Sequence, residues 1–181
     1  LPHIFMPQTR INEADLPSAN EKLNILQMCV ERLAEAGYVL IGMDHFARPD
    51  DELAIALSEQ TLQRNFQGYS TFADTNMLAF GVSSIGFVGN SYYQSAKDLD
   101  SYYNFLNADQ LPILRGLLLS PDDVLRREII QQIMCQFELN YAAVAEKYQL
   151  DFASYFAAEL AELPELAEIG LITLTPSGFQ V

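Results

Sequence analysis

The stretch of sequence that decides the fold is "GYVLIGMDHFARPDDELA", Gly37–Ala54. Its first half is a short apolar run rich in strand-forming residues, and it follows a clear helix pattern over Ser18–Ala36. Ser18 and Glu21 have the spacing of a capping box at the start of that helix, and Gly37 suits its end. Because a helix, a glycine and a buried strand in this order are typical of α/β units, we predict an α/β fold with a parallel sheet.

Asp44 and His45 come directly after this strand. In α/β folds, ligands bind beyond the carboxyl ends of the strands, so the pair is a candidate for a general base, a metal ligand or a substrate contact. The alternative is that Asp44 only begins a turn and His45 packs locally. A metal site needs a third ligand, and His3 is a weak partner, so a metal is the least favoured of these interpretations.

Arg48 and Arg64 are the basic residues nearest to the same strand end in the sequence. Either could bind a carboxylate or a phosphate, and the sequence weighs this evenly against a surface ion pair with the acids that follow Pro49. The tyrosine pairs at 92–93 and 102–103 are better explained by core packing.

The composition excludes several classes of protein. The 181 residues carry 24 acidic and 10 basic side chains, for a net charge of −14, which argues against a nucleic-acid partner. Half of the residues are hydrophobic, yet no apolar run approaches the roughly 20 residues that cross a bilayer, so we expect no membrane partner. The two cysteines, Cys29 and Cys135, both fall within helical apolar patterns and are expected to be core residues, which fits a reducing cytoplasm.

The pattern changes near Leu118, where we place a domain boundary. "SPDD" at Ser120 predicts a helix start, two further helices are expected near 140–148 and 152–163, and "ITLTPSGFQV" indicates a terminal hairpin. Three helices and a hairpin are typical of a winged-helix domain, but the acidic composition disfavours a nucleic-acid-binding regulator. The abrupt "LPHIF" at the beginning suggests a piece of a longer protein.

Five stretches, "GYVLIGMDHFARPDDELA", "RNFQGYST", "GVSSIG", "LRRE" and "FELNYAAV", closely resemble the later part of the oxygen-independent coproporphyrinogen III oxidases, in the same order. This family (HemN, radical SAM) serves haem biosynthesis. The resemblance implies that residues 1–118 are the C-terminal portion of a partial (β/α) radical SAM barrel. It implies that residues 119–181 are a helical, winged-helix-like domain that ends in a truncated hairpin.

The resemblance also implies an activity and its cofactors. Two propionates of coproporphyrinogen III are decarboxylated to vinyl groups. A 4Fe-4S cluster on three cysteines cleaves S-adenosylmethionine, and the resulting radical takes a hydrogen from the propionate. Residues of the family that match Phe66, Gln67 and Ile85 lie near a second S-adenosylmethionine.

The chain departs from the family in two respects. Cys29 and Cys135 cannot form the C-x-x-x-C-x-x-C motif, so the cluster ligands are expected outside this segment and the segment alone is expected to be inactive. Gln63 replaces a histidine that is usual before "RNFQGY". The alternative function is a non-catalytic relative that binds haem or a porphyrin. An open sheet edge at the missing strands would favour self-association.

Overall fold

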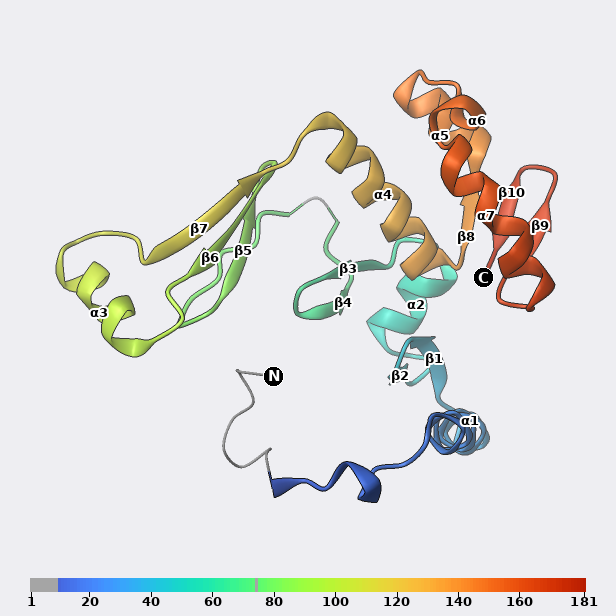
Figure 1. Cartoon of the computed structure of the whole chain (residues 1–181), viewed down its shortest axis with the longest axis horizontal. Helices are drawn as coiled ribbons and strands as arrows, with labels where there is room; N and C mark the ends of the chain where they lie inside the picture. Colours follow the sequence, from blue (N-terminus) through green and yellow to red (C-terminus); the bar gives the residue numbers. More distant parts are fainter. Residues whose placement is uncertain (1–9, 74) are drawn as a thin grey trace. The chain divides into compact units, whose positions relative to one another are not determined.

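The computed structural model describes residues 10–73 and 75–181, so the expectation for "LPHIF" lies outside the described part (Figure 1). The chain divides into two compact units, and the division falls between Ala54 and Ile55. Helices and strands alternate in both units, so the protein is of mixed α/β type, as the sequence predicted. Within the described residues, no helix is both long and apolar enough to span a membrane.

The first unit contains a short 3-10 turn at Glu13–Asp15, helix α1 (Ala19–Glu35), and strands β1 (Val39–Gly42) and β2 (His45–Ala47). The predicted capping box is present, because the Ser18 backbone N–H donates to Glu21 at 2.8 Å and the Ser18 hydroxyl accepts from the Glu21 backbone. No residue of α1 is buried within the described structure, although the sequence predicted an apolar inward face.

The neighbour of β1 differs from the sequence prediction. β1 pairs with β2 in an antiparallel hairpin, and every strand pairing among the described residues is antiparallel, so the predicted parallel sheet is wrong for this part of the chain. The reason lies in the turn: Gly42 has φ 150° and Met43 has φ 52°, which reverse the chain at once after β1. Helix α2 (Glu52–Ser58) then runs across the division between the units.

The second unit begins with a small hairpin and a three-stranded sheet. The hairpin consists of β3 (Gln63–Asn65) and β4 (Gly68–Ser70), and the sheet has the order β5 (Ile85–Val88), β6 (Ser91–Ser95), β7 (Ile113–Leu118). Helix α3 (Leu99–Asn107) connects β6 to β7.

The C-terminal part consists of α4 (Pro121–Gln136), α5 (Tyr141–Tyr148), α6 (Phe152–Tyr155) and α7 (Ala157–Glu168), with a sheet of order β8-β10-β9. Its strands are β8 (Glu138–Asn140), β9 (Thr173–Thr175) and β10 (Gly178–Gln180). The sequence predicted the β9–β10 hairpin and missed β8 as its third strand. Six buried side chains form the core: Leu125, Leu139, Val144, Phe152, Phe156 and Phe179.

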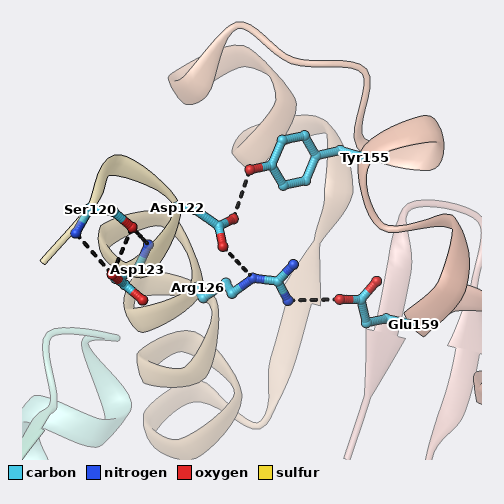
Figure 2. Close-up of polar contacts among 6 residues, drawn as sticks. All are labelled: Ser120, Asp122, Asp123, Arg126, Tyr155 and Glu159. Carbon is cyan, nitrogen blue, oxygen red and sulfur yellow. Dashed lines mark hydrogen bonds and ion pairs between the residues drawn. The ribbon is translucent and has the colours of Figure 1, made fainter.

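A polar clamp fixes α4 to the helices that follow (Figure 2). Arg126 donates from Nε to Asp122 at 2.9 Å and from Nη1 to Glu159 on α7 at 2.7 Å. The Tyr155 hydroxyl at the end of α6 donates to the other Asp122 oxygen at 2.7 Å. Hydrogen bonds from Tyr155 and Arg126 hold the pKa of Asp122 below its ordinary value, so this carboxylate stays ionised at neutral pH.

Helix α4 is also bonded to the β3–β4 hairpin. The Gln131 side chain donates to the Arg64 carbonyl at 2.7 Å, and the Tyr69 hydroxyl donates to the Met134 carbonyl at 3.2 Å. These two bonds hold the hairpin, which carries three of the predicted site residues, Arg64, Phe66 and Gln67, against the helix.

Candidate functional site

Phe66 and Gln67 form the two-residue loop of the β3–β4 hairpin. Asn65 pairs with Gly68 across the hairpin, and the Asn65 side chain accepts from the Gln67 backbone N–H at 2.7 Å. Gly68 has φ 126°, a conformation that side-chain-bearing residues rarely adopt. The short loop leaves the Phe66 side chain 60% exposed and also leaves Gln67 exposed, so both are available to a ligand.

Ile85 lies on one face of the β5-β6-β7 sheet. Directly opposed residues of antiparallel strands share a face, and the register opposes Ile85 to Gln94 and Phe87 to Tyr92. The same face continues onto β7. We call this the aromatic face; its residues are Ile85, Phe87, Tyr92, Gln94, Arg115 and Leu117.

The structure brings Phe66 onto the aromatic face. Its ring packs edge-on against Tyr92 with 5.4 Å between centroids, and Tyr92 packs on Phe87 at 4.6 Å. Phe66 and Ile85 were singled out separately in the sequence, and Phe66 packs on the face of the sheet that also carries Ile85. For Gln67, which follows Phe66 in the loop, the backbone bond to Asn65 fixes the position of the main chain.

Sequence reasoning missed two contributors to this surface. Arg127 of α4 places its guanidinium carbon 4.2 Å from the Phe87 ring centroid and 6.0 Å from that of Tyr92. Tyr92 was expected to serve core packing, and here it contacts both Phe66 and Phe87. The motif "LRRE" was noted, but nothing local distinguishes its second arginine from its first.

The opposite face of the sheet is tightly packed. Gly86 lies directly beneath the Tyr93 ring, and a Cβ at Gly86 would collide with that ring. The Tyr93 hydroxyl accepts from the Ala79 backbone N–H at 3.1 Å, and Ser84 donates to Ser95 at 3.0 Å. This packing gives the aromatic face a rigid support.

Asp44 and His45 lie in the first unit, at the β1–β2 turn. The Asp44 carboxylate and His45 Nδ1 are 2.8 Å apart, and their side chains are 81% and 43% exposed. Arg48 pairs with Asp50 at 3.3 Å, and both side chains are mostly exposed. This contact corresponds to the surface ion pair that the sequence weighed against a ligand role for Arg48.

Arg64 packs against α4. Its guanidinium lies 5.8 Å from the Tyr69 ring centroid, and its Nε is buried without a hydrogen-bond partner in the described structure. Cys135 of α4 is buried beside it, and burial raises the pKa of this thiol to about 11 although the Arg64 charge opposes the rise. Cys135 is thus a neutral core thiol, as the sequence predicted.

Cys29 corrects the prediction for the other cysteine. It is exposed on α1, because the helical apolar pattern around it meets no covering surface among the described residues. The residues present do not fit an iron–sulfur cluster: within the described ranges, no three His, Cys, Asp or Glu side chains gather in a metal-binding group. Two hollows on the described surface lie at Ala14–Ile25 and beside α3, and neither is lined by a residue of the aromatic face.

Comparison with known proteins shows what the chain is similar to. Residues 119–181 match the family described as the HemN C-terminal domain. The oxygen-independent coproporphyrinogen III oxidase of Salmonella typhimurium LT2 is 48% identical over 181 residues, which cover all of this chain and 40% of that protein. The enzymes of the same name from Escherichia coli K12 and Pseudomonas aeruginosa are 47% and 48% identical over the whole chain, which covers 40% and 39% of their lengths.

A solved structure agrees over the same span. The coproporphyrinogen III oxidase (HemN) from Escherichia coli, described as a radical SAM enzyme, matches with a TM-score of 0.93 and 46% identity over all of this chain and 42% of that one. The chain is similar throughout its length to the oxygen-independent coproporphyrinogen III oxidases. It spans about 40% of the length of these oxidases. The HemN C-terminal domain match begins at 119, whereas the compact units of the structure divide between Ala54 and Ile55.

Proposed function

We propose that this chain is part of an oxygen-independent coproporphyrinogen III oxidase, in which the aromatic face forms one wall of the cofactor site. The substrate is coproporphyrinogen III, the product has vinyl groups in place of two propionates, and the enzyme works in the cytoplasm. S-adenosylmethionine and a 4Fe-4S cluster, whose ligands lie outside this segment, supply the hydrogen-abstracting chemistry when bound. The observation that carries the proposal is the packing of Phe66 on Tyr92, on the same face of the sheet as Ile85.

The chemistry of the aromatic face suits a flat ligand with polar ends. Phe66, Ile85 and Tyr92 offer apolar contacts to a ring system, while the Gln67 amide can both donate and accept hydrogen bonds. In this proposal Asp44, His45, Arg48 and Arg64 remain candidates for substrate contacts. The segment 1–118 belongs to the barrel, and 119–181 is a winged-helix-like domain.

A chimeric enzyme tests the proposal. This chain replaces the matching 42% of the Escherichia coli oxidase, and anaerobic conversion of coproporphyrinogen III is followed together with iron content. We expect the chimera to assemble its cluster and form vinyl product. A chimera that folds and holds its cluster, yet only binds porphyrin without turnover, would contradict the proposal and favour the non-catalytic binding relative.

Substitutions in the chimera test the site residues. Gln67→Ala leaves a ligand group without its hydrogen-bond partner, and Ile85→Ala removes apolar contact, so each is expected to lower turnover about tenfold or more while the iron content stays unchanged. Val88→Ala is the matched control, because Val88 lies on the same strand but on the opposite face. Wild-type turnover in both site variants across a range of S-adenosylmethionine concentrations would remove Gln67 and Ile85 from the cofactor site.

A further inference from the structure

Two consecutive arginines of α4 have opposite environments. Arg126 is held between Asp122 and Glu159, so its charge is balanced within the chain (Figure 2). Arg127 extends to the other side, over the rings of Phe87 and Tyr92. No carboxylate of residues 10–73 or 75–181 forms an ion pair with Arg127.

A missing ion pair alone does not distinguish Arg127, because Arg64 and Arg115 also form none within the described residues, although acids outnumber bases by 24 to 10 in the sequence. Arg115 is exposed and its guanidinium donates to Gln94. Arg127 is half-buried, and its guanidinium lies over the Phe87 ring. A guanidinium above a ring keeps its N–H donors in its own plane, where they can bind a carboxylate through two parallel hydrogen bonds.

The position of Arg127 points to a ligand on the aromatic face. Phe87, which the guanidinium covers, is on the same face of β5 as Ile85, and Tyr92 links Phe87 to Phe66. A ring system resting on Phe66 and Ile85 would therefore carry its substituents toward Arg127. The ionised group that matches a guanidinium fork in shape and charge is a carboxylate.

We propose that Arg127 binds a carboxylate of the ligand that occupies the aromatic face. The inference rests on the proposed function for the identity of that ligand, which offers two sources of the same chemistry: a propionate of the porphyrin substrate, or the carboxylate of S-adenosylmethionine. In either case Arg127 is a positioning residue that holds the ligand by an anionic end while its ring rests on the apolar surface.

Binding measurements on this chain test the inference without any turnover. The first probe is coproporphyrin III, the air-stable oxidised tetrapropionate, compared with its tetramethyl ester by fluorescence titration. The second probe is S-adenosylmethionine, compared by calorimetry with 5′-methylthioadenosine, which lacks the carboxylate. The variants are Arg127→Met, which keeps the bulk of the side chain, and Arg127→Lys, which keeps the charge without the planar fork. Arg126→Met is the control for loss of one positive charge from the same helix.

We expect Arg127→Met to weaken binding of one carboxylate-bearing probe by about tenfold or more, with Arg127→Lys intermediate and Arg126→Met close to the parent. Loss confined to coproporphyrin III assigns the propionate, and loss confined to S-adenosylmethionine assigns the amino-acid carboxylate. The inference is overturned if the parent binds neither probe, if the carboxylate-free analogues bind equally well, or if folded Arg127→Met keeps full affinity. Folding of each variant is checked by its thermal midpoint. Because these are affinities of the chain itself, they are independent of whether the chimera turns over.

Discussion

Replacing Gly178 by alanine should destabilise the C-terminal sheet through one contact. A Cβ at Gly178 would lie 2.8 Å from the backbone carbon of Leu139 and closer still to its carbonyl oxygen. Neither atom can rotate away, because β8 and β10 are bonded through the neighbouring pair Phe179 and Leu139, and both of these side chains are in the core. Moving β8 and β10 apart to make room for one methyl group would therefore also displace these two core side chains.

The size of the expected loss in the free energy of unfolding follows from the rigidity of that contact. Overpacking costs about 1–3 kcal/mol, and a collision with backbone belongs at the upper end, near 3 kcal/mol. Alanine restricts the unfolded chain and returns up to about 1 kcal/mol, which does not offset the collision. At about 2–4 °C per kcal/mol for a chain of this size, a net loss of about 2–3 kcal/mol lowers the thermal midpoint by roughly 4–12 °C.

The thermal midpoints of the Gly178→Ala and Gly116→Ala variants, measured by circular dichroism, test this prediction. Gly116→Ala is the matched control, because its Cβ would meet a single atom, the Tyr92 carbonyl oxygen at 3.2 Å, in another antiparallel strand. We expect Gly116→Ala to melt within about 3 °C of the parent, at the 1 kcal/mol or less that a mild contact costs. Equal midpoints for Gly178→Ala, Gly116→Ala and the parent would refute the reasoning.

Three further predictions concern the chain itself. Iodoacetamide at pH 8 should alkylate exposed Cys29 long before Cys135, because Cys135 is buried and burial raises its pKa to about 11. Peptide mass spectrometry that finds both cysteines of the native protein labelled at the same rate would contradict this prediction. Burial opposes ionisation of Glu128, but hydrogen bonds from Lys147 and Tyr148 outweigh it and lower its pKa. Ionised Glu128 therefore stabilises the fold above its unfolded pKa, and this stability is lost as the pH falls through the lower folded pKa. The Glu128→Gln variant should unfold at a lower urea concentration than the parent at pH 7, and the difference between the two urea midpoints should narrow toward pH 3. A difference that stays constant with pH would show that the charge is not responsible. Strand β7 is an edge strand with its residues exposed, so light scattering should show concentration-dependent self-association, and a monomer at all concentrations would exclude it.

The sequence predicted features that depend on neighbours along the chain. The capping box at Ser18 was predictable because it pairs a cap with an acid three residues later, and the helix start at Ser120 because a proline and two acids follow it. Cys29 was placed wrongly, because a helical apolar pattern does not reveal whether anything packs against it. β8 was missed because its three residues are recognisable as a strand only through pairing with β10, far along the chain.

The candidate site was predictable in part for the same reason. Phe66, Gln67 and Ile85 were identified from the resemblance, but the sheet face that Phe66 shares with Ile85 depends on the register of β5 with β6. Arg127 could not be found from sequence, since its partner Phe87 comes from a distant strand and Arg126 beside it is the same residue type. Long-range side-chain contacts of this kind leave no local pattern.

The polar clamp of Arg126 has a consequence for the order of events in folding. Its partners Asp122, Tyr155 and Glu159 lie on three separate helices, so the clamp can close only after α6 and α7 have arrived beside α4 (Figure 2). Contacts that form after the rate-limiting step leave the folding rate unchanged and slow unfolding instead. A clamp that forms at this late stage would slow the unfolding of the C-terminal helices and leave their folding rate unchanged.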